Sequence, residues 1–126
     1  MKDYPNCTLI RKTSMQALED FEEESIDFVY IDGHHGFMYV AQDIFEWSKK
    51  VKKGGFIMGH DYAYTSRHKH YRKPYTLQVK YVVDAYRRAM DIKPIYILGA
   101  TKKTFEGEKR DQFRSWFWVK TWDEVI

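Results

Sequence analysis

Two clusters of polar side chains in this sequence have the composition needed to bind a cation or move a proton. One cluster, DGHH at residues 32–35, directly follows a short apolar run, and the other, HDY at residues 60–62, follows a second apolar run. Carboxylates and neutral imidazoles both bind divalent metals, and imidazole titrates near neutral pH, so it can also accept a proton from a hydroxyl. Both clusters therefore suit metal binding and acid–base chemistry.

The elements expected around the two clusters place them at one edge of a sheet. Residues 26–31 and 56–58 are rich in β-branched and aromatic side chains, which predicts two strands, and the apolar periodicity of residues 37–52 predicts a helix between them. Gly54 and Gly55 are expected to end that helix. Because parallel strands joined by a helix end at the same edge, both clusters should face one crevice.

The remaining pattern predicts an α/β domain with the element order βαβαβαββ, in which the last strand is antiparallel. The other expected elements are a strand at Cys7–Arg11, a helix from Thr13 or Ser14 to about Glu22, a helix at about Tyr75–Met90, and strands at Ile95–Leu98 and Phe113–Lys120. Thr13 and Gln16 have the spacing of a capping box. The aromatic last strand should have at least one face covered by a helix or a partner. We expect a single domain over residues 1–126.

Composition narrows the possible classes of protein. A hydrophobic content of 44%, with 17% aromatic residues, is too high for a disordered chain. No apolar run approaches the roughly 20 residues that span a bilayer, so we expect no membrane role and a cytoplasmic setting. The single Cys7 excludes an internal disulfide and a multi-cysteine zinc site. A net charge of +3 is not typical of nucleic-acid binding.

The order of these elements and motifs resembles the C-terminal half of class I S-adenosylmethionine-dependent methyltransferases, in particular the group that methylates small hydroxylated acceptors such as sugars. The resemblance rests on IDGHH after the first apolar strand, on Asp43, Ile44 and Trp47 in the helix, and on the later motifs KKGGFIMGHDY, IYILG and SWFWVK. It covers nearly the whole chain from about Thr8. It implies a truncated Rossmann-like sheet, mostly parallel, with a C-terminal antiparallel hairpin.

The resemblance also implies a catalytic site. By motif position, Asp32, His60 and Asp61 would bind a divalent cation, Mg²⁺ by preference, that orients the hydroxyl of the acceptor. His35 would be the general base that receives the hydroxyl proton. His60 stands where metal-dependent relatives more often carry an acid. Simpler structural roles remain open, as a turn carboxylate for Asp32 and as a core histidine for His60.

Part of a cofactor site follows from the same resemblance. Ser14 matches a position near the adenine, and we expect it to contact S-adenosylmethionine together with Asp32, Gly33 and His34. The simpler role of Ser14 is a helix cap, and a structural or solvent-facing place is the favoured alternative for His34. The glycine-rich turn and the acidic residue that hold the cofactor in the family would precede Thr8. They are absent, because no glycine occurs before Gly33.

Two functions of different classes are therefore expected. The first is methyl transfer from S-adenosylmethionine to a hydroxyl of a small molecule, assisted by a divalent cation. The second is a non-catalytic remnant of the methyltransferase fold that binds a metal or a partner in the same crevice. Cofactor binding distinguishes the two.

The missing strands should leave an open, apolar edge on the strand that contains Phe28. Three ways of pairing that edge remain open: Cys7–Arg11 moves in beside that strand, a second copy of the chain supplies the pairing, or the sequence is part of a longer gene product that supplies it. Of these we expect a homodimer.

The basic and aromatic loop from Tyr62 to Lys73 follows the second polar cluster. In the resembling enzymes this loop covers the acceptor, so we expect a substrate lid, with a solvated loop as the alternative. Binding of single-stranded nucleic acid is the least expected role.

Overall fold

Four strands form one mixed sheet in this computed structural model, which describes residues 4–63, 78–99, 106–107 and 113–121. The strands are β1 (Ile26–Ile31), β2 (Val51–Tyr62), β3 (Tyr96–Leu98) and β4 (Arg114–Val119). Their order across the sheet is β1-β2-β4-β3, with β1 and β2 parallel and β4 antiparallel to both of its neighbours. The expected α/β class and the C-terminal antiparallel pairing are confirmed, and the parallel part of the described sheet is the pair β1–β2.

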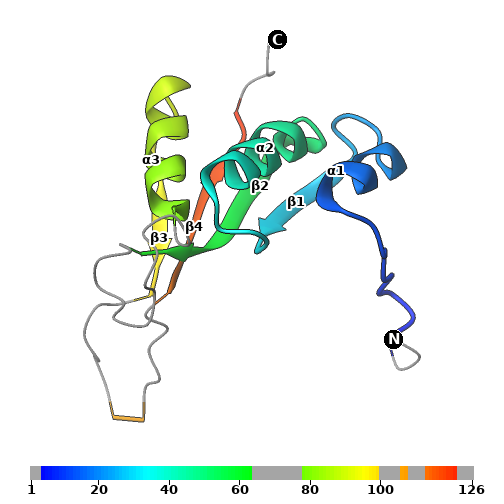
Figure 1. Cartoon of the computed structure of the whole chain (residues 1–126), viewed down its shortest axis with the longest axis horizontal. Coiled ribbons are helices and arrows are strands. Elements are labelled where there is room, and N and C mark those ends of the chain that lie inside the picture. The colour runs from blue at the N-terminus through cyan, green and yellow to red at the C-terminus, as the bar shows by residue number, and fades with distance from the viewer. Residues whose placement is uncertain (1–3, 64–77, 100–105, 108–112, 122–126) are drawn as a thin grey trace.

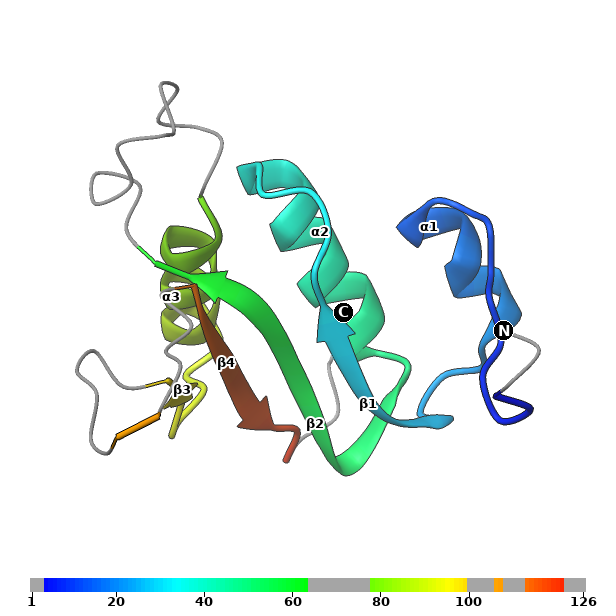
Figure 2. The ribbon, with the colours of Figure 1, turned by 90° about the horizontal axis from the view of Figure 1, so that it is seen from below.

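The helices α2 and α3 cover one face of this sheet, and α1 lies beside α2 (Figure 1; Figure 2). Their bounds are α1 (Ser14–Ala17), continued by the 3₁₀ turn η1 (Leu18–Asp20), α2 (Phe37–Ser48) and α3 (Val79–Ala89). The capping box is confirmed, because the Thr13 hydroxyl accepts from the Gln16 amide and the Gln16 side chain accepts from the Thr13 amide. Among the described residues, no helix is long and apolar enough to cross a membrane.

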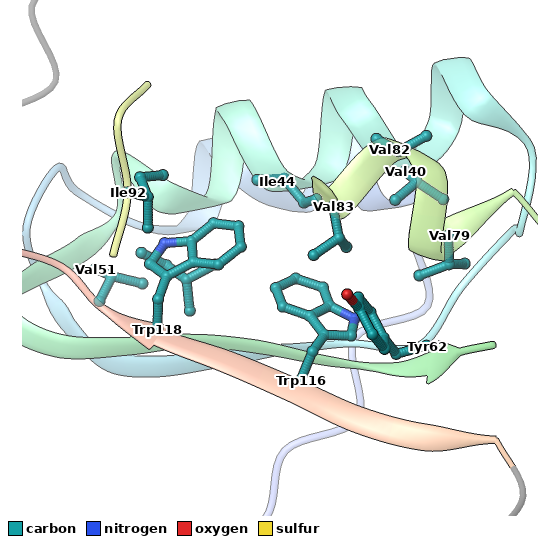
Figure 3. Close-up of a cluster of buried hydrophobic side chains, with 11 residues drawn as sticks. Val40, Ile44, Val51, Tyr62, Val79, Val82, Val83, Ile92, Trp116 and Trp118 are labelled. Atoms are coloured by element: carbon teal, nitrogen blue, oxygen red, sulfur yellow. The ribbon is translucent and has the colours of Figure 1, made fainter. Parts of the chain in front are cut away.

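The hydrophobic core lies between the sheet and the helices α2 and α3 (Figure 3). Trp116 and Trp118 on β4 both point toward the helices and are buried, and Tyr86 of α3 stacks on Trp118 with ring centroids 6.0 Å apart. Phe117 lies on the opposite face of the strand, where it stacks on Tyr96. The expectation that one face of the aromatic last strand is covered is confirmed, and α3 provides the cover. The other buried members of the core are Val40, Ile44, Val51, Ile57, Tyr62, Val79, Val82, Val83 and Ile92.

The prediction of a strand at Cys7–Arg11 is wrong. These residues form no strand and are exposed, with the large apolar side chains of Leu9 and Ile10 among them. A strand needs a neighbour for its backbone groups, and the sheet described here does not include this segment. The first predicted pairing of the open edge, in which Cys7–Arg11 moves in beside β1, is therefore wrong as well.

The expected role of Gly54 and Gly55 as the end of a helix is also wrong. Helix α2 ends at Ser48, and both glycines lie inside β2, where the pairing with β1 shifts its register. Gly54 has a φ of +82°, which glycine adopts without strain. The buried Lys120 favours this early end, because its Nζ donates to the carbonyl oxygens of Ser48 and Val51 at 2.9 and 2.8 Å. These tertiary contacts override the helical periodicity of residues 49–52.

Two further expectations fall partly on residues outside the described ranges. Helix α3 begins at Val79 in the described chain, and the expected earlier start at Tyr75 lies outside it. The loop expected to act as a substrate lid also lies outside the described residues from residue 64 onward.

A buried ionic network joins α3 to the end of β2. The Lys80 ammonium donates to the Tyr62 hydroxyl at 3.0 Å and to the Asp84 carboxylate at 2.9 Å, and the Tyr62 hydroxyl donates to Asp84 at 2.7 Å. Burial alone would raise the pKa of Asp84, but the hydrogen bonds from Tyr62 and Lys80 together outweigh it and lower that pKa. Asp84 therefore stabilises the folded chain in its ionised form.

Replacing Asp84 with asparagine should lower the free energy of unfolding by about 2 kcal/mol at neutral pH, because it leaves the buried ammonium of Lys80 without its carboxylate. The folded pKa of Asp84 lies below the unfolded value of about 4, so its stabilisation is present above that pH and is lost as the pH falls through the folded value. Urea unfolding at several pH values should show the gap between wild type and D84N closing in acid. Equal stability at neutral pH would contradict this.

Candidate functional site

The two polar clusters lie together at one edge of the sheet. Ile31, the last residue of β1, pairs with Gly59 of β2. Asp32 comes directly after Ile31 and Asp61 two residues after Gly59, so both carboxylates lie near the carboxyl ends of two neighbouring, parallel strands. The prediction that both clusters face the same crevice is confirmed for the described side chains of Asp32, His35 and Asp61, which approach one another closely.

The backbone of β2 directs Asp61 into this crevice. Its pairing with β4 shifts register between Gly59 and Tyr62, and Asp61 itself has a φ of +65°, in the left-handed region that side chains other than glycine seldom adopt. The indole of Trp116 donates to the carbonyl oxygen of His60 at 3.2 Å and so anchors the bulge. Asp61 is also buried. Buried carboxylates on strained backbone are typical of functional sites.

Gly59 permits the close approach of β1 and β4 on either side of this bulge. A Cβ at this position would lie 2.6 Å from the carbonyl oxygen of Ile31 and 2.6 Å from the ring of Trp116. The site therefore depends on a residue without a side chain two positions before Asp61.

His35 contacts Asp61 from the loop between β1 and α2. Its Nε2 lies 2.8 Å from Asp61 Oδ2. Gln78, the residue before α3, holds this loop in place. Its backbone amide donates to the carbonyl oxygen of His35 at 3.0 Å, and its side-chain oxygen accepts from the backbone amide of Phe37 at 2.8 Å. The position of the imidazole is thus fixed by the ends of two helices as well as by Asp61.

Asp32, His35 and Asp61 form a group whose potential ligand atoms all lie within 4.8 Å of one another. This group differs from the predicted ligand set of Asp32, His60 and Asp61, since it contains His35 in place of His60. The Nδ1 atom of His60 lies 3.3 Å from Asp61 Oδ1, at the margin of the group. Two carboxylates and one imidazole at these distances have the composition of a divalent-cation site.

A pocket of about 290 Å³ lies beside the carboxyl end of β1. Its lining residues are Ser14, Val29, Tyr30, Ile31, Asp32, Gly33, Asp43 and Trp47. Three of the four residues predicted to contact the cofactor, Ser14, Asp32 and Gly33, therefore line one pocket. His34 is not among the lining residues: its Nδ1 accepts from the amide of Gly36 at 3.0 Å, and its ring packs on Tyr39.

A chain of hydrogen bonds gives the pocket a polar wall. The Trp47 indole donates to the Ser14 hydroxyl at 2.8 Å, and that hydroxyl donates to Asp43 at 2.6 Å. Burial raises the pKa of Asp43, and the hydrogen bond from Ser14 opposes that rise. The wall therefore offers a carboxylate and a hydroxyl, in fixed orientation, to a ligand in the pocket.

Three residues of the site were not predicted as site residues. Asp43 and Trp47 are four residues apart on α2, so they share a face of the helix, and this spacing is a signal the sequence contains. The role of Gln78 depends on contacts with residues more than forty positions away, and no local pattern indicates it.

Comparison with known proteins agrees with this fold. Residues 3–62 match a protein-family model described as a methyltransferase domain. A candidate O-methyltransferase from Klebsiella pneumoniae aligns with 90% of this chain at a TM-score of 0.56 and 16% identity. The O-methyltransferase from Bacillus cereus, solved in complex with SAH, aligns with 85% at a TM-score of 0.54 and 15% identity. This chain carries a methyltransferase fold.

The methyltransferase fold of this chain corresponds to about half of each solved relative. The chain covers 50% of the Klebsiella protein and 46% of the Bacillus protein. An uncharacterized protein of Sinorhizobium fredii, y4gI, is 36% identical over 53 residues, which are 42% of this chain and 6% of that protein. The prediction of a truncated Rossmann-like methyltransferase sheet is confirmed.

Proposed function

We propose that this chain is a methyltransferase-type domain that binds a divalent cation and part of S-adenosylmethionine, for methyl transfer to a hydroxyl of a small molecule. The observation that carries the proposal is the convergence of Asp32, His35 and Asp61 within 4.8 Å at the carboxyl ends of β1 and β2. The pocket next to it shares Asp32 with this group. Both solved relatives are described as O-methyltransferases, which supports the reaction class.

The side chains present fit a divalent cation. Asp61 is buried while Asp32 is exposed, so an ion held between them would be reached from solvent on one side. Two carboxylates suit Mg²⁺, and the imidazole of His35 shifts the preference toward Mn²⁺, Fe²⁺ or Zn²⁺. A bound cation would polarise and orient the acceptor hydroxyl.

His35 has a second possible role as proton acceptor. In the proposed transfer, bound S-adenosylmethionine would supply the methyl group, its sulfur being the leaving group, and His35 would receive the proton of the acceptor hydroxyl. Asp61, 2.8 Å from Nε2, would stabilise the resulting imidazolium. One imidazole nitrogen cannot bind a cation and accept a proton at once, so the two roles need either different nitrogens or different states of the site.

The pocket beside β1 fits part of the cofactor. Its volume of about 290 Å³ lies just below the range for small-molecule sites, about 300–1,000 Å³. Trp47 and Ile31 offer apolar surface, and Ser14 and Asp43 offer polar atoms, which together suit a purine and its ribose. The rest of the cofactor would need protein surface beyond the described residues.

The second candidate function is a non-catalytic remnant that binds a cation but no cofactor. The small volume of the pocket favours it. Under this alternative, Asp32, His35 and Asp61 would still bind the cation.

Titration calorimetry with S-adenosylmethionine, with and without Mn²⁺, separates the two functions. Methyltransferase function predicts saturable cofactor binding that S14A weakens about 10-fold, because the serine positions both Asp43 and Trp47. S25A is the matched control, since the Ser25 hydroxyl donates to the Glu22 carbonyl oxygen and Ser25 does not line the pocket. Cation binding without cofactor heat would show that this chain alone does not hold the cofactor, and would overturn the proposed transfer by this chain.

A further inference from the structure

Arg114 places a cation at the edge of the sheet that carries the proposed cation site of Asp32, His35 and Asp61. It is the first residue of β4 and pairs with Tyr62, the last residue of β2, so both side chains lie on the face that the helices cover (Figure 3). Paired Cα atoms lie at most about 5.5 Å apart and consecutive ones about 3.8 Å, so the Cα atoms of Arg114 and Asp61 are within roughly 9 Å. A small molecule at the cation site can therefore reach the guanidinium.

The charge of Arg114 has no carboxylate partner in the part of the chain that the structure describes. Its guanidinium carbon lies 5.7 Å from the centre of the Tyr62 ring, a cation–π contact. The ammonium of Lys80, 4.2 Å from the centre of the same ring, is by contrast paired with Asp84 at 2.9 Å. The Arg114 side chain is half-buried, but its nitrogen atoms keep contact with solvent. A half-buried cation with open donors is suited to binding an anion.

Binding of the proposed divalent cation leaves the charge of Arg114 unbalanced. Asp32 and Asp61 supply two negative charges, which such a cation neutralises. The Asp84 carboxylate is already engaged by Lys80 and is not available to the guanidinium. The loaded site would therefore carry a net positive charge beside the acceptor.

The sequence that joins the two sides of the site adds positive charge. Residues 64–77 contain four lysines and arginines and no aspartate or glutamate. They follow Ala63, whose amide donates to the carbonyl oxygen of Asp61 at 2.9 Å, and they precede Gln78, whose amide donates to that of His35 at 3.0 Å. Both neighbours of this basic sequence thus contact the site, and its charge favours an anionic ligand there.

We propose that the methyl acceptor is an anion, and that Arg114 binds its carboxylate or phosphate group while its hydroxyl lies at the cation site. The inference rests on the proposed function, because it names the class of acceptor for the same site. Arginine suits this role, since its planar guanidinium pairs with two oxygens of a carboxylate or phosphate at once. A strand added at the open edge of β1 would lie about 14 Å from β4, so an extension of the sheet there leaves Arg114 open.

The test is titration of the full chain, in the presence of Mg²⁺, with glucuronate, glucose 6-phosphate and the uncharged glucose. The wild type should bind at least one anion about 10-fold more tightly than glucose, because a charge-assisted pair contributes about that factor or more. Comparison of the two anions separates a carboxylate from a phosphate. R114Q should abolish the preference and leave the affinity for glucose unchanged, whereas R114K, which keeps the charge, should retain part of it.

R88Q is the matched control, because it removes the same charge from an exposed residue near the far end of α3 and should keep the full preference. Near-UV circular dichroism of the buried Trp116 and Trp118 verifies that each variant is folded. Equal affinity of the wild type for glucose and both anions, or no binding of either anion, would overturn the proposal. A preference that folded R114Q retains would overturn it too.

Calorimetric titration with Mn²⁺ on the same proteins tests the proposed function separately. Arg114 is not a member of the cation site, so R114Q should bind Mn²⁺ as the wild type does. A wild type that binds no Mn²⁺, yet prefers anions in a manner that depends on Arg114, would overturn the proposed transfer and uphold the anion site. Mn²⁺ binding without any preference for anions would do the reverse.

Discussion

D61N is expected to lower the affinity of the protein for Mn²⁺ at least about 100-fold. Second-shell changes at metal sites cost about 10- to 100-fold, and this substitution removes the charge of a ligand itself. Asp61 is the buried member of the group and lies against His35, so no solvent-exposed carboxylate replaces it. Asparagine tolerates the left-handed backbone at this position as well as aspartate does, so the fold should persist. Calorimetric titration with MnCl₂ measures the change.

D27N is the matched control for this experiment. Asp27 is an exposed carboxylate on the same sheet, paired with Lys52 at 3.2 Å and outside the three-residue group. Its replacement should leave Mn²⁺ affinity unchanged. If D61N binds Mn²⁺ as tightly as D27N does, Asp61 is not a ligand.

G59A is expected to lower the free energy of unfolding by about 3 kcal/mol, the upper part of the range for overpacking. The added methyl would lie 2.6 Å from the carbonyl oxygen of Ile31 and from the Trp116 ring, and neither is the end of a flexible side chain. The strands must separate to accommodate it. Since the same residues hold the bulge at Asp61, G59A should also weaken Mn²⁺ binding.

G33A provides the comparison for that stability measurement. A Cβ on Gly33 would lie 3.6 Å from the Asp43 carboxylate, an ordinary contact, and the residue needs no left-handed backbone. Urea unfolding should place G33A close to wild type and G59A far below it. Equal stability of the two variants would show that β2 can shift away from Trp116 without cost.

The local part of this fold could be predicted from the sequence. Strands β1 and β2 and helix α2 follow from apolar periodicity, and the antiparallel β4 from its alternating aromatic residues. The convergence of Asp32 and Asp61 then follows from one rule of parallel strand geometry, because Asp32 directly follows β1 and Asp61 is the next-to-last residue of β2. Short-range pattern and a single topological rule were sufficient here.

The remaining features depend on contacts that no local pattern encodes. Cys7–Arg11 has β-propensity but no strand to pair with, so propensity alone could not decide its state. The inclusion of His35 rather than His60 depends on the bulge that turns Asp61, and on Gln78, which holds the His35 loop from a distant helix. The ionic network of Lys80 and the early end of α2 likewise depend on tertiary contacts.

The most direct test of the central claim is anomalous diffraction from a crystal of the whole chain grown with Mn²⁺. We expect a single strong peak within bonding distance of Asp32 and Asp61, and the same map shows whether an imidazole nitrogen of His35 is a ligand. A peak elsewhere on the chain, or none between these carboxylates at saturating Mn²⁺, would contradict it.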